Sequence, residues 1–235
     1  MRHEFPMRPD ACADPTSRLV RQSRARQWQR LRVAVLLPLL LVTAGATTTE
    51  TIEPLPAIGR LDFAGHEDRF HCTATLVGAD RALTAAHCLE PPASIANTYF
   101  QPGFAIDRGA ERLQVRSWHT ELAGGDVALL CLATDARTPR LPVAERGPSP
   151  GEGLTVVGYG IPADRGQRHD SCTVDEIRGD GSFVLNCPLR PGQSGAPVLR
   201  HTAQGREVVG VAYATSNRQS LAWAISAATA LPECR

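Results

Sequence analysis

The sequence of 235 residues predicts an all-β protein built from two β-domains. After residue 56, short apolar segments alternate with Gly, Pro and Asp, and no long 3.6-residue periodicity interrupts them. This alternation is typical of barrels and sandwiches. A stretch rich in proline and glycine, 138–153, divides the pattern near its midpoint. We therefore expect two domains of about 90 residues each, at 57–140 and 154–235, joined by a connection at 141–153.

Several segments carry this strand pattern. In the first domain we expect strands within 57–61, 72–78 and 81–86. In the second domain we expect them within 154–160, 183–185, 196–199 and 208–213. The alanine-rich segment from Trp223 to Leu231 is expected to close the chain as a short helix.

The N-terminal 46 residues have the pattern of a secretory signal peptide. Eight arginines precede residue 33, and an uncharged run from Val33 to Thr49 contains Ala44-Gly45-Ala46. This order favours cleavage after Ala46, with 47–56 left as a short linker and the protein secreted or periplasmic. The alternative is that 33–49 is retained as an anchor, although its 17 residues fall short of the about 20 needed to span a bilayer. After cleavage we expect no stable membrane association.

Charge and cysteine content narrow the function further. Without residues 1–46, the chain has 17 basic and 21 acidic residues, which disfavours nucleic-acid binding. Six of the seven cysteines remain, and in an exported chain they predict three disulfides among 15 formal pairings. No Cys-x-x-Cys motif is present, and we interpret His66-Glu67-Asp68 and His71 as part of a solvated loop. We expect neither a metal nor a cofactor.

The first candidate for chemistry is Ser194, in the sequence Pro191-Gly192-Gln193-Ser194-Gly195-Ala196-Pro197. A serine flanked by glycines can occupy a tight turn in which the hydroxyl is accessible and backbone N–H groups converge beside it. An ordinary surface turn has a similar composition. A nucleophile at Ser194 therefore requires a base and an orienting acid elsewhere in the chain.

His87 and Asp126 are the candidates for those two roles. A disulfide between Cys88 and Cys72 would close a loop of about 15 residues and hold the backbone beside the His87 imidazole. A fixed histidine is a better general base than a mobile one. Asp126 precedes the apolar run 127–130, so it either caps a turn or enters a core, where a carboxylate needs a partner.

Three motifs in order resemble those of the chymotrypsin-like serine peptidases. They are Thr84-Ala85-Ala86-His87-Cys88, Asp126-Val127-Ala128-Leu129-Leu130 and Gly192-Gln193-Ser194-Gly195-Ala196-Pro197, and the resemblance covers about 57–235. It implies a double β-barrel with a Ser-His-Asp triad of His87, Asp126 and Ser194 in the cleft between the barrels. It also implies an oxyanion hole formed by the N–H groups of Gly192 and Ser194.

The same resemblance implies an exported serine endopeptidase that hydrolyses polypeptides, and we expect it to be a monomer. The alternative is an inactive homologue that keeps the fold as a binding module. The expected disulfides are Cys72–Cys88, Cys172–Cys187 and Cys131–Cys234. The substrate pocket would include Pro188 and Leu189, with a wall at Tyr213, Ala214 and Thr215.

The sequence departs from the trypsin-like pattern at Gln193, where zymogens of that type carry Asp. The departure resembles bacterial members, including glutamyl endopeptidases, although the pocket wall lacks the histidine that those enzymes carry. No Asp lies at the pocket base, so a preference for Arg or Lys is not supported. We expect a site that is preformed without trimming near Ile58. Cys187, Pro191 and Pro197 are the expected supports of the turn.

Overall fold

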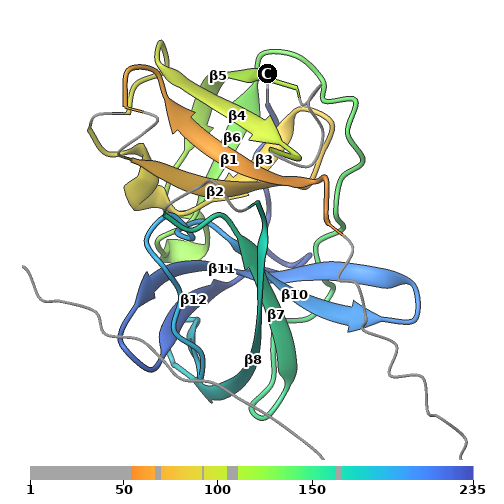
Figure 1. Cartoon of the computed structure of the whole chain (residues 1–235). Coiled ribbons are helices and arrows are strands. Elements are labelled where there is room, and N and C mark those ends of the chain that lie inside the picture. The colour runs from red at the N-terminus through yellow and green to blue at the C-terminus, as the bar shows by residue number, and fades with distance from the viewer. Residues whose placement is uncertain (1–53, 67–69, 92, 105–110, 162–165, 235) are drawn as a thin grey trace, which may run out of the picture. The chain divides into compact units, whose positions relative to one another are not determined.

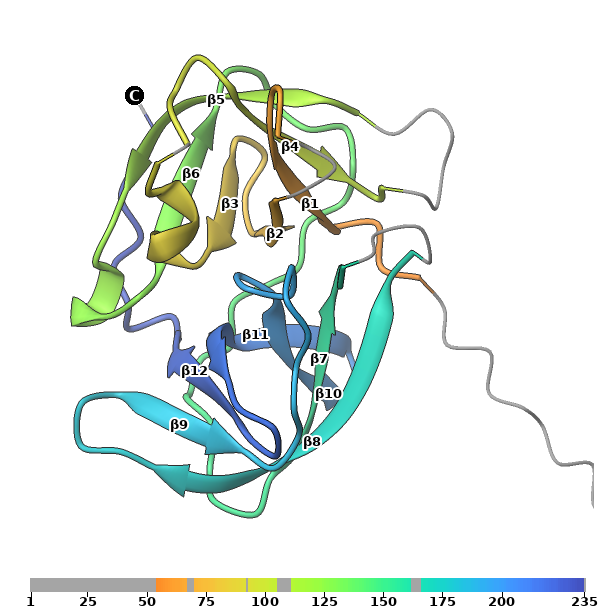
Figure 2. The same ribbon diagram turned by 60° about the vertical axis from the view of Figure 1, so that its left-hand side comes forward.

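The computed structural model describes residues 54–66, 70–91, 93–104, 111–161 and 166–234. These residues form two closed antiparallel barrels of six strands, which confirms the predicted all-β double barrel (Figures 1 and 2). The first barrel consists of β1 (Ile58–Phe63), β2 (His71–Leu76), β3 (Arg81–Thr84), β4 (Thr98–Pro102), β5 (Leu113–His119) and β6 (Ala128–Leu132). The second consists of β7 (Gly153–Gly158), β8 (Arg168–Ile177), β9 (Ser182–Leu185), β10 (Pro197–Thr202), β11 (Gly205–Thr215) and β12 (Ser220–Ala224).

The predicted signal peptide at 1–46, the alternative anchor at 33–49 and most of the linker at 47–56 lie outside the described residues. Among the residues that are described, no helix has the length and apolar character required to cross a membrane.

The side chains of strand β6 are buried on both faces of the strand, in two different apolar clusters. Ala128, Leu130 and Leu132 belong to the core of the first barrel. Leu129, which points to the opposite face, packs in a separate apolar cluster that both barrels build. This explains the continuous apolar run after Asp126, because a strand buried on both faces does not alternate with polar residues.

The apolar cluster between the barrels positions the site. From the first barrel it contains Leu83 and Leu129, and from the second it contains Val157 and Val211, all of them buried. Burial of apolar surface stabilises a contact by roughly 25 cal/mol per Å². The cluster therefore holds the ends of β3, β6, β7 and β11 against one another.

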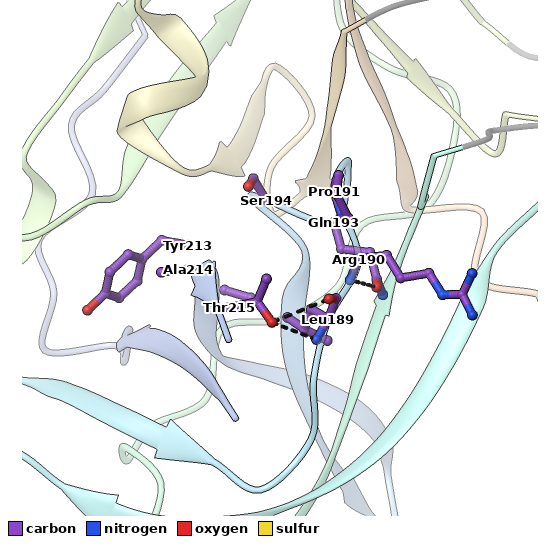
Figure 3. Close-up of a pocket in the computed structure, with 9 residues that line it drawn as sticks. Leu189, Arg190, Pro191, Gln193, Ser194, Tyr213, Ala214 and Thr215 are labelled. Carbon is purple, nitrogen blue, oxygen red and sulfur yellow. Dashed lines mark hydrogen bonds between the residues drawn. The ribbon is translucent and has the colours of Figure 1, made fainter. Parts of the chain in front are cut away.

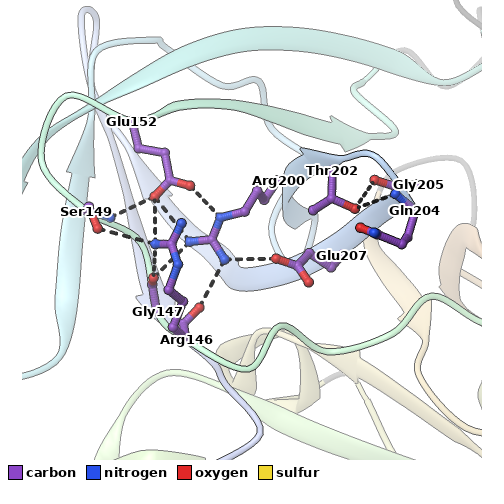
Figure 4. Close-up of polar contacts among 9 residues, drawn as sticks. All are labelled: Arg146, Gly147, Ser149, Glu152, Arg200, Thr202, Gln204, Gly205 and Glu207. Carbon is purple, nitrogen blue, oxygen red and sulfur yellow. Dashed lines mark hydrogen bonds and ion pairs between the residues drawn. The ribbon is translucent and has the colours of Figure 1, made fainter.

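The connection between the barrels is attached to the second barrel by Arg200 of β10 (Figure 4). The buried Arg200 guanidinium donates to both oxygens of Glu152 and, at 2.9 Å, to Glu207 Oε1. It also donates to the carbonyls of Arg146 and Gly147, at 3.2 and 2.8 Å. The hydrogen bond from Arg200 is the main reason that the pKa of Glu152 lies below its usual value. The connection therefore has a defined path along β10.

The expected C-terminal helix is wrong. Residues Ser220–Ala224 form β12 between β11 and β9, and the structure has no helix from there to residue 234. Alanine favours helix only weakly, and a helix of about nine residues is marginal in water. Strand pairing outweighs that preference, and the chain then runs back to the first barrel, beside which the C terminus lies (Figure 1).

All three expected disulfides are confirmed. Cys72 pairs with Cys88, Cys172 pairs with Cys187, and Cys131 of β6 pairs with Cys234. The last disulfide closes the longest loop, with a sequence separation of 103 residues. It fastens the end of the second domain to the first barrel.

Removing this long-range disulfide tests how much the C-terminal segment stabilises the fold. For the double variant Cys131→Ala, Cys234→Ala we expect the free energy of unfolding to fall by about 2–5 kcal/mol, because the unfolded chain regains the entropy of a long loop. Denaturant unfolding with both proteins oxidised measures the difference. The matched comparison is Cys172→Ala with Cys187→Ala, whose separation is 15 residues. A change of less than about 0.5 kcal/mol for the long loop would contradict this expectation.

Candidate active site

The His87 side chain comes from a short 3₁₀ helix, η1 (Ala86–Leu89), that follows β3. The helix is fixed at Cys88 by the disulfide to Cys72 of β2, and Cys88 is fully buried. The imidazole is therefore carried by a segment with little freedom to move, while about a third of the side chain remains exposed.

Asp126 lies beside His87 and makes two hydrogen bonds with it. Oδ1 accepts the His87 main-chain N–H at 2.9 Å, and Oδ2 lies 2.7 Å from the ring Nδ1. With its proton on Nδ1, the ring donates to the carboxylate and leaves Nε2 free to accept a proton. The carboxylate therefore fixes both the orientation and the tautomer of the imidazole.

The segment before Asp126 is strained and pressed against the second barrel. Glu121 and Ala123, beside and within the short 3₁₀ helix η2 (Leu122–Gly124), have φ of 57° and 53°, which non-glycine residues rarely adopt. A Cβ on Gly125 would lie 2.0 Å from the ring of Trp223. Such strain persists where the surrounding structure determines the backbone, and it is concentrated at functional sites.

The two partners shift each other's pKa in opposite directions. The hydrogen bond that the His87 ring donates to Asp126 is the largest influence on the pKa of His87 and raises it above 6.5, against the smaller opposing effect of partial burial. Partial burial acts to raise the pKa of Asp126. The hydrogen bonds from the His87 ring and main chain together outweigh it and hold that pKa below 3.8. The pair therefore favours a charged carboxylate beside an imidazole of increased basicity.

Ser194 lies in a turn whose two glycines are required by its geometry. Gly192 and Gly195 have φ of 91° and 84°. A Cβ on Gly192 would lie 2.6 Å from His71 Nε2, and one on Gly195 would lie 2.1 Å from the Thr73 carbonyl oxygen. The turn is therefore seated against β2 of the first barrel, close to the segment that carries His87.

Main-chain hydrogen bonds define the turn. The Ser194 carbonyl accepts the N–H of Thr73 at 2.8 Å, and Gly195 N–H donates to the carbonyl of Ala212 at 2.7 Å. The Pro191 carbonyl accepts the N–H of Ile161 at 2.8 Å. Within the described part of the chain, the N–H groups of Gly192 and Ser194 have no acceptor. Two neighbouring amides are thus available to a ligand oxygen beside the serine.

The Ser194 hydroxyl is not bonded to His87 in this structure. Among the described residues it makes no hydrogen bond, and His87 Nε2 makes only a weak contact, with Cys88 Sγ at 3.9 Å. His87, Cys72 and Cys88 lie close together, but both sulfurs belong to the disulfide and offer no thiolate to a metal. The structure brings His87 and Asp126 into direct contact and seats the Ser194 turn on the same barrel.

His71 does not lie in a solvated loop, which corrects the sequence-based interpretation. It belongs to β2, is buried behind Gly192, and its Nε2 lies 3.2 Å from the Tyr159 carbonyl oxygen. Burial, followed by the positive charge of Arg60, lowers the pKa of His71 to about 4. A neutral histidine therefore packs behind the turn. Of the other members of the suggested group, Glu67 and Asp68 lie outside the described residues, and His66 is partly exposed just after β1.

A cavity of about 100 Å³ opens beside Ser194 (Figure 3). It is lined by Leu189, Arg190, Pro191, Gln193, Ser194, Ala212, Tyr213, Ala214 and Thr215, whereas Pro188 is not among its lining residues. The Thr215 hydroxyl accepts the Leu189 N–H at 2.9 Å and lies 3.3 Å from the Leu189 carbonyl oxygen. The Arg190 side chain extends away from the cavity (Figure 3). None of the lining residues is acidic.

Sequence reasoning singled out Gln193 but missed three polar residues that support the turn, Thr73, Arg168 and Asp170. Gln193 is buried and donates to Asp170 Oδ2 at 2.8 Å, and Asp170 accepts from Arg168 at 2.7 Å. Thr73 donates through its hydroxyl to the Gly192 carbonyl at 3.0 Å. The Gln193–Asp170 and Thr73–Gly192 contacts have no local signal in the sequence, because their partners are separated by 23 and 119 residues.

Solved structures with this fold include several proteases. A Glu endopeptidase aligns with a TM-score of 0.60 and 18% identity over 75% of this chain and 87% of its own. The secreted serine protease VesC of Vibrio cholerae has a TM-score of 0.59 and 21% identity over 73% of this chain and 44% of its own. An inactivated protease paralogue of the scabies mite has a TM-score of 0.58 and 20% identity over 72% and 89%. At these identities the likeness concerns the fold.

The family is established by the sequence itself. A search of curated proteins finds no significant match. The trypsin-like peptidase domain, however, matches residues 72–211, which is more than half of the chain and includes His87, Asp126 and Ser194. The chain belongs to the trypsin-like peptidase family.

Proposed function

We propose that this chain is a serine endopeptidase that cleaves polypeptides through an acyl-enzyme. The observation that carries the proposal is the bonded His87–Asp126 pair beside a turn in which Ser194 is flanked by two available amide N–H groups. Family membership supports a peptidase at the general level. The roles of the individual residues are inferred from their geometry.

In this mechanism Ser194 Oγ attacks the carbonyl carbon of the scissile peptide while His87 Nε2 accepts the hydroxyl proton. Asp126 holds the ring tautomer and stabilises the imidazolium. The N–H groups of Gly192 and Ser194 donate to the oxyanion, each contributing of order 3 kcal/mol. His87 then gives its proton to the leaving amine, and water, activated by the same ring, hydrolyses the ester. The Ser194 hydroxyl must rotate toward Nε2 when substrate binds, since catalytic hydrogen bonds are often loose in the free enzyme.

A second candidate is an inactive homologue that uses the fold as a binding module. The absence of a Ser194–His87 hydrogen bond among the described residues favours it, as does the similar fold of an inactivated paralogue. Against it stands the complete set of reacting groups. A binding module has no need for a polarised imidazole or for unpaired amides beside an accessible serine.

We also propose that the protein is exported. Three disulfides are typical of an oxidising compartment, and one protein of the same fold is described as secreted. The signal-peptide pattern before residue 47 is consistent with this location.

The cavity beside Ser194 suggests which side chain precedes the cleaved bond. An apolar cavity of about 150 Å³ holds a benzene molecule, so the 100 Å³ beside Ser194 suits a smaller, aliphatic group. The lining offers no carboxylate to a basic side chain. We therefore propose a preference for small, uncharged residues, with Thr215 limiting the depth.

Labelling with a fluorophosphonate tests whether the site reacts. The wild type should be labelled at Ser194, Ser194→Ala should not, and kcat of that variant should fall by about 10⁶-fold. Ser171→Ala, which removes an exposed serine of β8, is the matched control and should label normally. Folded protein with intact disulfides that fails to label would favour the binding module.

The pH dependence of kcat/KM should report the His87–Asp126 pair. Protonated His87 cannot accept the Ser194 proton, so activity is lost as the pH falls through the His87 pKa, which Asp126 raises above 6.5. Asp126→Asn should move the acidic limb of this pH profile to lower pH and reduce kcat by roughly 10⁴-fold. His201→Gln, distant on β10, should leave the limb in place. A wild-type limb with its midpoint well below 6.5 would contradict the assignment.

The depth of the cavity can be tested at Thr215. Replacing Thr215 with Gly removes the side chain that is bonded to Leu189, so larger residues should be accepted. The ratio of kcat/KM for Phe over Ala before the cleaved bond should rise by about 10-fold or more. Asn217→Gly, in the turn after β11, is the control and should not change the ratio. A wild type that cleaves best after Phe or Arg would overturn the proposed preference.

A further inference from the structure

The Gln193 side chain is fully buried behind the nucleophile, and both ends of its amide are used. Oε1 accepts the Arg190 N–H at 2.7 Å, which closes the turn locally (Figure 3). Nε2 donates to Asp170 Oδ2 at 2.8 Å. Because the acceptor of the amide is already bonded to a main-chain donor, the orientation of the Gln193 amide follows from its partners.

Asp170 is itself held on a rigid element. It lies in β8, is paired with Val156 of β7, and accepts from Arg168 Nη2 at 2.7 Å. Two residues further on, Cys172 is joined by its disulfide to Cys187, which leads into the turn. The Asp170 carboxylate is therefore a fixed acceptor with one oxygen for Arg168 and the other for Gln193.

Gln193 links the two amides that face the reacting oxygen. Its neighbours on either side are Gly192 and Ser194. The Gln193–Ser194 peptide carries the Ser194 N–H, so a shift of residue 193 turns that N–H directly and displaces the adjoining Gly192 as well. The Gln193 N–H donates to the Arg190 carbonyl at 3.0 Å, and its carbonyl accepts the Ala196 N–H at 2.9 Å. A shift of about 1 Å in reacting geometry can cost 100-fold in rate.

Among the described residues, Ile58 makes no hydrogen bond to Gln193 or Asp170. Ile58 begins β1 and is buried, and its N–H donates to the Leu55 carbonyl at 3.0 Å. Leu55, three residues before Ile58, exchanges hydrogen bonds with Gln167 through both its N–H and its carbonyl. The carboxylate that supports the turn is internal to the second barrel.

We propose that Asp170, acting through Gln193, is the positioning residue that holds the Gly192 and Ser194 amides in their catalytic orientation. This inference rests on the proposed peptidase function. It replaces the supports expected from the sequence with a specific side-chain contact, to which the Cys172–Cys187 disulfide contributes by anchoring β8. Asp170 does not touch the substrate, so its effect is exerted on the rate and not on binding.

An exchange of donor and acceptor tests the contact. Gln193→Glu places two carboxylates against each other, and kcat should fall about 100-fold. In Asp170→Asn the new amide has one acceptor oxygen for two donors, so either Arg168 or Gln193 faces its NH₂ group, and kcat should fall about 10-fold. In the double variant the amide at 170 donates to the carboxylate at 193 and accepts from Arg168, so kcat should return to within about threefold of the wild type.

Two further readouts separate positioning from a general structural role. KM should stay within about threefold in all four proteins, because substrate binding is not altered. Amide hydrogen exchange, followed by NMR, should accelerate at Gln193 and Ala196 in Gln193→Glu and slow again in the double variant. Glu176→Gln, another carboxylate on β8, is the matched control and should change neither rate nor exchange.

The proposal is overturned if the double variant is no faster than Gln193→Glu, if the losses appear only in KM, or if exchange at Gln193 and Ala196 is the same in all proteins. A wild type that fails to react with the fluorophosphonate refutes the proposed function, and the exchange pattern then decides the positioning role by itself.

Discussion

The structure of the site depends on one buried threonine. Thr73 of β2 donates its N–H to the Ser194 carbonyl and its hydroxyl to the Gly192 carbonyl, while that hydroxyl accepts the Tyr159 N–H at 3.0 Å. The side chain is fully buried, and a polar group left without a partner there would cost about 1–3 kcal/mol. Thr73 follows Cys72, whose disulfide holds the segment of His87. The turn that contains Ser194 on one barrel is thereby fixed to the strand that holds the His87 segment on the other.

The Asp126 side of the site, on the first barrel, depends in turn on the second barrel. The loop that carries Asp126 lies against Trp223 of the second barrel, so closely that Gly125 has no room for a Cβ. The first barrel therefore supports the Ser194 turn, and the second barrel supports the Asp126 loop. The apolar cluster that contains Leu129 and Val211 holds these two contacts together. Because the interface is apolar and packed, a small separation of the barrels would disturb both halves of the site at once.

The sequence predicts the parts of this arrangement that have local signals. The Asp126 contact follows from a carboxylate placed before a buried strand, and the strands with β-branched runs are evident. The sequence does not predict strand β8, because Arg168–Ile177 is largely polar and only two of its ten residues are buried. The alanine-rich segment after Trp223 misleads because its helix preference is weaker than strand pairing. The Gln193–Asp170 contact joins residues 23 apart, and only the closed barrel brings them together.

The Ile161–Pro191 hydrogen bond bears on whether such a site can react. A simple turn would be completed by a bond from the Ser194 N–H to the Pro191 carbonyl, which would consume one of the two amides. That carbonyl is instead occupied by the N–H of Ile161, from the loop after β7. The Gln193 carbonyl, in the peptide that carries the Ser194 N–H, is likewise occupied, by the N–H of Ala196 at 2.9 Å. With both carbonyls engaged, the two peptide planes cannot rotate without breaking hydrogen bonds, and the N–H groups of Gly192 and Ser194 are kept from closing the turn on itself.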